Sequence, residues 1–412
     1  MRLLVSGIPY DGGKSGISVY VREVVRALFE QGHSLTLLRE PEARGGASEV
    51  EKLKVEKLKS APSTFQPFNL STFQPFNCLF APAWTRRAIF SMLWHLFVLP
   101  FWIRRHRSEF DGFVICAANR RVCAWYPLPT VATIHDLANF HIPGKYSRLR
   151  MFYLAHILPF FAKRAQHLVA VSGATKADMV KYWHCRESAV TVLYNGLTEN
   201  CSQMTIGTNV HKSQMANIDI CGNGGNCEQW RFVNNGSILY ISRIEHPGKN
   251  HVRLIEAYGK LPRALAEAHP LVLAGADWKD AEVVHEAAAK SPHADLIRFT
   301  GFVEDVESLW AEAGFYVFPS LFEGFGLSLI EAMARGIPCA CSNNGSLGEI
   351  AADVALTFNP ERVEDIAEAL TRLLTERAED RAARIARGRE HVKKFSWQDH
   401  AKGIARLLGD EA

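Results

Sequence analysis

The sequence predicts an α/β fold with two domains, each built on an open parallel sheet. Short apolar strands alternate with helical patterns in both halves of the chain, and this alternation is typical of parallel sheets. The length of 412 residues also exceeds what a single hydrophobic core usually holds. Hydrophobic residues make up 48% and charged residues 22% of the chain, as in soluble globular domains.

The first half of the chain begins with a strand, a glycine-rich turn that contains Gly12 and Gly13, a helix and a second strand. The same rhythm continues to residue 198, where we place the end of the first domain. Strands are expected at 3–6, 34–38, 112–116, 130–134, 167–172 and 190–194, and helices at 19–28, 146–165 and 174–182.

Two segments interrupt the alternation of strands and helices. Residues 41–80 contain tandem repeats, in which Glu-Lys-Leu-Lys and Ser-Thr-Phe-Gln-Pro-Phe-Asn each occur twice. Residues 199–236 are rich in Asn, Gly, Ser and Gln, with hardly any periodicity. We expect the low-complexity insertion 41–80 to form a loose surface loop without catalytic residues, and 199–236 to form an extended linker.

The second domain is predicted to span residues 237–390. A C-terminal helix within 391–412 is expected to cross back to the first domain. Two open parallel sheets would bind a ligand at the carboxyl ends of their strands, in a central cleft that both sheets face. The strands of this domain are expected at 237–243, 270–275, 296–300, 315–319 and 337–341.

Charge and cysteine content exclude several classes of function. A formal charge of +4 is too small to predict binding to nucleic acid, although it suits an anionic ligand. The nine cysteines form no CxxC pair, which favours a reduced protein without a metal site. The apolar run at the N-terminus is only three residues long, so we expect no export signal and a cytoplasmic location.

The segment 86–107 has two interpretations. Its apolar part, 88–103, is flanked by Arg86 and Arg87 on one side and by Arg104, Arg105 and Arg107 on the other. Sixteen residues are fewer than the ~20 that cross a bilayer. The segment is therefore either a helix buried against the sheet or a basic, aromatic helix in peripheral contact with a membrane surface.

The strongest functional motif is Glu323-Gly-Phe-Gly-Leu-Ser-Leu-Ile-Glu331, which follows a strand and opens a helix. Gly324 and Gly326 allow a tight turn and close approach to a ligand. The first N–H groups of the helix would favour an anion, such as a phosphate. Glu331 is suited to accept hydrogen bonds from the hydroxyls of a ribose, and Glu323 from those of a sugar. An ordinary turn with surface glutamates is the structural alternative.

Three companion motifs favour the functional interpretation. Arg243 ends a strand and Lys249 precedes a helix, so these two cations could neutralise a diphosphate leaving group. His135 ends a strand of the first domain and could bond to a transferred sugar. The amides of Gly12 and Gly13 could meet a phosphate. Taken singly, each companion could also be a solvated loop or an ordinary strand end.

Taken in order, these motifs resemble the family-4 group of GT-B glycosyltransferases. The resemblance covers both halves of the chain and includes Lys249-Asn250, Gly348-Glu349-Ile and the Glu-x7-Glu segment. Its other motifs lie at 12–13, 133–137, 171–172, 194–196, 239–243, 299–302, 355–360 and 395–397.

The resemblance implies a GT-B fold with two Rossmann-like domains and retaining transfer of a hexose from a nucleoside-diphosphate sugar. This sugar is a co-substrate, and neither a metal nor another cofactor is expected. The acceptor would be a glycan or a lipid-linked sugar in surface polysaccharide synthesis, at the inner face of the cytoplasmic membrane.

The resemblance also implies roles for individual residues. Arg243 and Lys249 would hold the diphosphate, and Glu331 the ribose. His135 would lie beside the reacting centre, and the leaving phosphate would act as the base. The donor sugar would bind Glu323 together with the backbone around Gly324, namely the amides of Phe325, Gly326 and Leu327.

Two other functions stay open at this point. The same fold could serve a sugar-nucleotide epimerase or a phosphorylase, although no lysine stands out as a pyridoxal site. A non-catalytic protein that binds sugar nucleotides is the other alternative, and the intact set of Arg243, Lys249, Glu323 and Glu331 argues against it.

Overall fold

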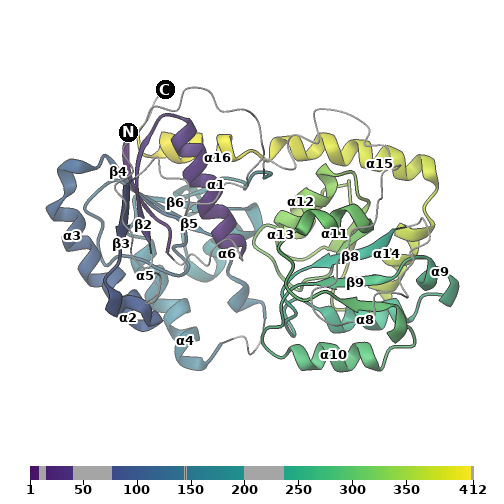
Figure 1. Ribbon diagram of the computed structural model, residues 1–412. Coiled ribbons are helices and arrows are strands. Elements are labelled where there is room, and N and C mark those ends of the chain that lie inside the picture. The colour runs from purple at the N-terminus through teal and green to yellow at the C-terminus, as the bar shows by residue number, and fades with distance from the viewer. Residues whose placement is uncertain (9–14, 40–76, 143, 145, 199–235, 410–412) are drawn as a thin grey trace, which may run out of the picture. The chain divides into compact units, whose positions relative to one another are not determined.

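The computed structural model describes residues 1–8, 15–39, 77–142, 144, 146–198 and 236–409, and these residues form two parallel sheets (Figure 1). The first sheet has the strand order β3-β2-β1-β4-β5-β6-β7. Its strands are β1 (Arg2–Ser6), β2 (Ser34–Arg39), β3 (Asn77–Phe80), β4 (Gly112–Ile115), β5 (Thr130–Ile134), β6 (His167–Ala170) and β7 (Val190–Val192).

The second sheet has the order β10-β9-β8-β11-β12-β13, and its neighbouring strands pair in parallel. The fold class predicted from the sequence, two α/β domains with parallel sheets, is therefore confirmed. The strands are β8 (Ser237–Ile241), β9 (Leu271–Ala274), β10 (Ile297–Phe299), β11 (Ala313–Phe318), β12 (Cys339–Ser342) and β13 (Leu356–Phe358).

Helices cover both faces of the second sheet, with α11 and α12 on one side and α8 and α10 on the other (Figure 1). The central strands β8, β9 and β11 are buried over most of their length, as expected of strands covered on both faces. The helices of this half are α8 (His251–Gly259), α9 (Arg263–Ala268), α10 (Ala281–Ala289), α11 (Val306–Glu312), α12 (Leu327–Ala334), α13 (Ser346–Ala351), α14 (Val363–Thr375) and α15 (Ala378–His391). The last helix of the chain is α16 (Trp397–Leu407).

The first half begins its helices with α1 (Gly16–Glu30), whose N-cap Ser15 accepts a hydrogen bond from the amide of Ser18. The predicted helix at 146–165 contains a π-helical turn, Tyr153–Ile157, between two α-helical turns. The other helices here are α2 (Ala88–Leu93), α3 (Leu99–Arg105), α4 (Arg148–Phe152), α5 (Leu158–Ala162) and α6 (Gly173–Trp183). Short 3₁₀ turns lie at Ala83–Arg86, Arg107–Glu109, Ala138–Phe140, Glu187–Ala189, Ala294–Leu296 and Val392–Lys394.

The contacts within the chain define two compact units. One comprises Met1–Ile134, Tyr153–Val169 and Gln398–Ala412, and the other comprises His135–Phe152 and Ala170–Trp397. The predicted domain boundary at residue 198 lies between β7 and β8, and so between the two sheets.

The C-terminal helix α16 is held in the first unit by a buried tyrosine. The Tyr20 hydroxyl lies 2.8 Å from His400 Nε2 and 3.0 Å from Thr133 Oγ1, and the side chains of all three residues are buried. Tyr20 thereby connects α1 to both the sheet and the end of the chain. Burial raises the pKa of Tyr20 well above its ordinary value, so the hydroxyl stays protonated at neutral pH.

The insertion predicted at 41–80 needs a correction at its end. Residues 77–80 form β3, which pairs in parallel with β2 and is an edge strand of the first sheet. A sheet edge offers main-chain donors and acceptors to any neighbouring extended segment, and repeats in the sequence do not reveal this pairing. The rest of the insertion and the linker 199–235 lie outside the described residues.

Segment 86–107 is helical, with a π-helical turn at Trp94–Val98 between α2 and α3. Trp94, Leu99 and Ile103 are buried, which agrees with the prediction of a helix packed on the protein. Within the described part of the chain, no helix is both long and apolar enough to cross a membrane.

We expect Tyr20→Phe to lower the free energy of unfolding by about 1–3 kcal/mol, because it leaves buried polar partners unsatisfied. Urea unfolding measures this change. Tyr153→Phe is the matched control, since the buried Tyr153 hydroxyl has no hydrogen-bond partner among the described residues and its loss should cost little. Equal effects of the two substitutions would contradict the role given to Tyr20.

Candidate active site

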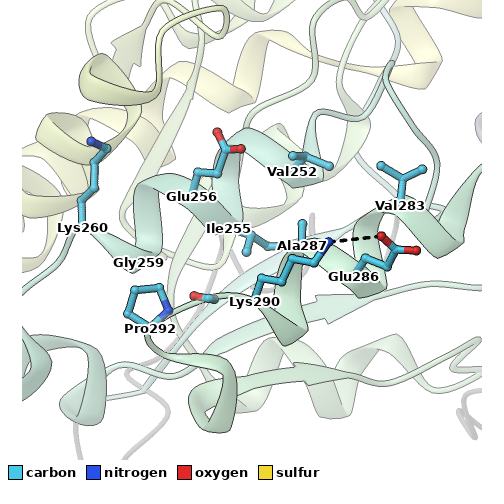
Figure 2. A pocket seen from close by; sticks show the side chains of 11 residues that line it. Val252, Ile255, Glu256, Gly259, Lys260, Val283, Glu286, Ala287, Lys290 and Pro292 are labelled. Carbon is cyan, nitrogen blue, oxygen red and sulfur yellow. Dashed lines mark hydrogen bonds and ion pairs between the residues drawn. The ribbon is translucent and has the colours of Figure 1, made fainter.

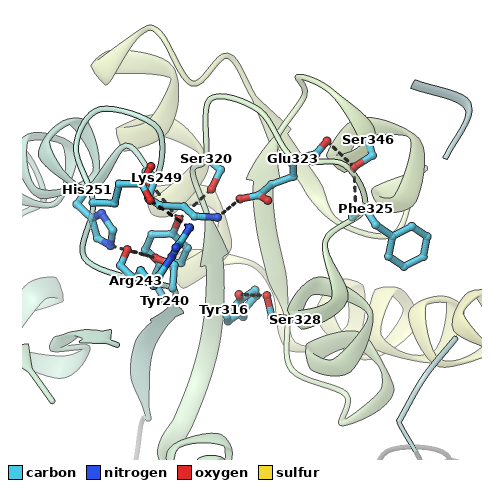
Figure 3. Close-up of polar contacts among 12 residues, drawn as sticks. Tyr240, Arg243, Lys249, His251, Tyr316, Ser320, Glu323, Phe325, Ser328 and Ser346 are labelled. Atoms are coloured by element: carbon cyan, nitrogen blue, oxygen red, sulfur yellow. Dashed lines mark hydrogen bonds and ion pairs between the residues drawn. The ribbon is translucent and has the colours of Figure 1, made fainter. Parts of the chain in front are cut away.

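The candidate site is built on the carboxyl ends of two neighbouring strands, β8 and β11. The segment after β8 carries Arg243 and Lys249, and the loop after β11 carries Glu323 and leads into α12 (Figure 3). Parallel strands bring their carboxyl ends to the same edge of a sheet, so these loops meet. The structure thus brings together the charged residues of the two strongest sequence motifs.

Lys249 and Glu323 form an ion pair, with 2.7 Å between Lys249 Nζ and Glu323 Oε1. Their side chains are only 22% and 18% exposed, so water screens the pair weakly. Burial lowers the pKa of Lys249, but its interactions with neighbouring groups, the Glu323 carboxylate foremost, outweigh burial and leave the pKa raised. Lys249 is therefore a permanent cation at neutral pH. The sequence did not predict that these two residues contact each other.

Tyr240 positions the backbone of Lys249. Its hydroxyl donates a hydrogen bond of 3.0 Å to the carbonyl oxygen of Lys249 and lies 2.9 Å from Ser320 Oγ (Figure 3). Burial raises the pKa of Tyr240 to about 12, so the hydroxyl remains a donor. The side-chain amide of the buried Asn250 donates to the carbonyl oxygens of Pro319 and Pro360, at 3.0 and 2.7 Å. These bonds fix the turn before α8.

Arg243 is held more loosely than Lys249. Its side chain is 48% exposed, and one guanidinium nitrogen lies 3.3 Å from Glu245 Oε2. The guanidinium also lies over the ring of Trp278, 5.0 Å from its centroid. The positive charge of Arg243 lowers the pKa of Lys249.

The loop between Glu323 and α12 depends on two glycines. Gly326 is the N-cap of α12 and has a φ of 102°, a conformation that a residue with a Cβ rarely adopts. A Cβ on Gly324 would overlap the carbonyl oxygen of His135. Ser346 holds the loop from the other side, because its hydroxyl lies 2.9 Å from the carbonyl oxygens of both Glu323 and Phe325.

Helix α12 begins at Leu327, so Glu331 is its fifth residue, as the sequence predicted. The first amides of such a helix favour an anion, and a carboxylate one turn later can reach a neighbouring hydroxyl.

His135, which follows β5, is buried, and its backbone contacts Gly324. Gly12 and Gly13, the remaining predicted donor-site residues, lie outside the described residues.

Ser320 and Ser346 shape this site but belong to no sequence motif, and Tyr240 lies within the motif 239–243 but was given no role. The position of Tyr240 within an aliphatic strand was the one sequence signal for its structural role, since a buried tyrosine usually needs a hydrogen-bond partner. The two serines gave none.

Two other observations concern ligands. In the described residues, His, Cys, Asp and Glu side chains form no group of three or more that could hold a metal ion. A groove of about 480 Å³ lies between α8 and α10 (Figure 2). It is lined by helical side chains such as Val252, Ile255, Val283 and Lys290, and does not include the loops at the strand ends.

Comparisons with known proteins agree with this architecture. Residues 228–391 match the family model for glycosyl transferases group 1, and residues 14–200 match the model for glycosyltransferase family 4. The O-antigen chain mannosyltransferase B of Escherichia coli is 28% identical over 272 residues, which are 65% of this chain and 67% of that protein. A glycogen synthase of Mycobacterium tuberculosis is 30% identical over 258 residues, 59% of each chain.

The longer serotype-specific mannosyltransferase WbdA of Escherichia coli is 29% identical over 294 residues, 68% of this chain but only about a third (34%) of that protein's length. Among solved structures, Anabaena HepE in complex with UDP and glucose aligns over 100% of both chains, with a TM-score of 0.65 and 17% identity. The lipopolysaccharide glycosyltransferase WaaG also aligns over 100% of both chains, with a TM-score of 0.64 and 16% identity.

We expect Gly324→Ala to lower the melting temperature and to impair ligand binding, because the new Cβ must displace either the loop or the backbone of His135. Gly388→Ala is the control: Gly388 lies within α15, and its Cβ would make only ordinary contacts, at 3.8 Å or more. Alanine is the better helix former, so this variant should be neutral or more stable by up to about 1 kcal/mol. Thermal unfolding compares them, and an equally stable Gly324→Ala would refute the close packing.

Proposed function

Since the chain belongs to the group 1 glycosyltransferases of the GT-B fold, we propose that it transfers a hexose from a nucleoside-diphosphate sugar with retention of configuration. The acceptor is a glycan or a lipid-linked sugar, and the pathway is the synthesis of a surface polysaccharide. One observation carries the proposal: a partly buried lysine–glutamate pair lies beside the loop that opens a glycine-capped helix.

In the proposed reaction, the bond between the anomeric carbon and the diphosphate breaks, and the acceptor hydroxyl attacks from the same face. A phosphate oxygen of the leaving group takes the proton of that hydroxyl. Negative charge therefore accumulates on the diphosphate, where Lys249 and Arg243 supply positive charge without a metal ion. The amides at the start of α12 add to this stabilisation.

Glu323 and Glu331 recognise the two sugars of the donor. Lys249 contacts Oε1 of Glu323, so Oε2 of the same carboxylate can accept from a hydroxyl of the hexose while Lys249 stays neutralised. The amides of Phe325, Gly326 and Leu327 bind the same hexose. Glu331 accepts from the hydroxyls of the ribose. His135 bonds to the transferred hexose beside the reacting carbon.

We also propose a peripheral membrane contact through α2, the π-helical turn and α3. Exposed apolar side chains recur every four residues along this segment, while the opposite face is buried. Exposed arginines stand at both ends, at 87 and 104–105. Such a face suits the interface of an anionic membrane, and it would place the enzyme at the cytoplasmic surface, near a lipid-linked acceptor. The exposed apolar residues are Ile89, Phe90, Leu93, Phe97, Val98 and Phe101.

We expect Lys249→Ala and Glu331→Ala each to reduce sugar transfer by about 10²–10³-fold, because each removes a contact to the donor. The donor is first selected by thermal shift with UDP-, GDP- and ADP-sugars, since a ligand of the native state raises the melting temperature. Lys290→Ala, which removes an exposed lysine at the C-cap of α10, is the control and should keep full activity. Near-normal transfer by either site variant would refute the assignment.

For the membrane contact, we expect the double variant Phe97→Asp, Phe101→Asp to lose sedimentation with anionic vesicles, because it places two charges on the apolar face. Wild-type binding should weaken as salt rises, since the arginine contribution is screened. Val283→Asp makes the same change on an exposed valine of α10 and should leave vesicle binding unchanged. A wild-type protein that never sediments with such vesicles would refute the contact.

A further inference from the structure

Glu349 has a position that the donor site does not require. It lies in the first turn of α13, yet its carboxylate accepts from the first two amides of another helix, α6. Oε1 accepts from the Gly173 amide at 2.9 Å, and Oε2 from the Ala174 amide at 3.0 Å. A carboxylate at a helix N-terminus is stabilised by the unpaired amides and by the helix dipole. Glu349 therefore holds the start of α6.

Two features of the surroundings make this contact specific. A Cβ on Gly173 would lie 3.0 Å from Glu349 Oε1, so a glycine leaves room for the carboxylate. The Tyr194 hydroxyl donates to Glu349 Oε1 at 2.7 Å. Burial and then this bond raise the pKa of Tyr194 to about 12, so the hydroxyl keeps its proton at neutral pH. Glu349 thus accepts three hydrogen bonds from two segments.

The same turn of α6 carries Thr175, which connects the two halves of the candidate site. Its Oγ1 lies 3.2 Å from the carbonyl oxygen of His135 and 3.4 Å from that of Gly324. Ser172, the N-cap of α6, orients this hydroxyl from 3.0 Å away. Thr175 is fully buried, so water does not compete for these contacts. The Thr175 hydroxyl therefore contacts both the backbone of His135 and the loop around Gly324, here called the donor-sugar loop, and so fixes the spacing between them.

A second layer of contacts holds the same two segments together. The ring of His141 stacks on Phe322, with 4.0 Å between the ring centroids. His141 Nε2 also lies 2.7 Å from Asp178 Oδ2, and Asp178 belongs to α6. Ala138, Ile142 and Phe322 form a small buried cluster. Helix α6 is thus the part that places residues 135–142 against the loop at 322–324.

We infer that Glu349 and Thr175 are positioning residues for sugar transfer: Glu349 anchors α6, and Thr175 sets the spacing between His135 and the donor-sugar loop. This inference rests on the proposed function. Neither residue belongs to the proposed contacts with the nucleotide, which are Arg243, Lys249 and Glu331. Their loss should therefore reduce kcat and leave the affinity for the nucleoside diphosphate nearly unchanged.

The test compares Thr175→Val and Glu349→Gln with the wild type. We expect kcat to fall about tenfold to a hundredfold, the loss typical of reacting groups misplaced by about 1 Å. The dissociation constant for the nucleoside diphosphate, measured by calorimetry, should change less than twofold. Thr175→Ser keeps the hydroxyl and should stay within threefold of the wild-type kcat. This rescue separates positioning from a merely structural role.

Hydrogen–deuterium exchange tests the same contacts without reference to activity. Exchange within 135–142 and 322–326 should be faster in Thr175→Val and Glu349→Gln than in the wild type, because these segments lose their shared anchor. Asp305→Asn is the matched control, since it weakens the cap of another helix, α11, where the side chain accepts from the Glu307 amide. This variant should leave kcat and exchange in both segments unchanged.

The outcomes separate the two claims. Unchanged kcat and unchanged exchange in folded variants would overturn the inference while leaving sugar transfer established. Equal losses in kcat and in nucleotide affinity would overturn it as well, because the residues would then support binding. A wild type that binds no nucleoside diphosphate would refute the proposed function, yet faster exchange in the variants would still support the coupling through α6.

Discussion

The ion pair between Lys249 and Glu323 is the interaction on which the candidate site depends. Two charges that are largely removed from water are stable only as partners, so the loops after β8 and β11 must keep one spacing. In the proposed reaction, this pair would hold positive charge for the leaving phosphate next to a carboxylate for a hexose hydroxyl before a donor binds. Preorganisation of this kind lowers the reorganisation that the reaction itself requires.

Most of the residues that maintain this arrangement have no direct chemical role. Tyr240 and Asn250 hold the backbone around Lys249, and Ser346 holds the backbone on either side of Gly324. Each uses a side chain to satisfy main-chain carbonyls in irregular loops, where neither helix nor sheet supplies a partner. The positions of the charged side chains therefore depend on hydrogen bonds that other side chains make to the backbone around them.

The strands, the helix opened by Gly326 and the position of Glu331 could all be predicted from the sequence, because hydrophobic periodicity and glycine turns act over a few residues. The partners of Asn250 could not, since Pro319 and Pro360 lie 69 and 110 residues away along the chain. Likewise, β3 was missed because its signal was hidden by neighbouring repeats. The π-helical turn at Trp94–Val98 was not predicted, although Pro100, which cannot donate the usual helical hydrogen bond, follows it by two residues.

A crystal structure of the protein with a bound nucleoside diphosphate would test the central claim most directly. We expect diphosphate oxygens within hydrogen-bond distance of Lys249 Nζ and the Arg243 guanidinium, and ribose hydroxyls within hydrogen-bond distance of the Glu331 carboxylate. A nucleotide bound elsewhere, for example in the groove between α8 and α10, with the Lys249–Glu323 pair untouched, would contradict it.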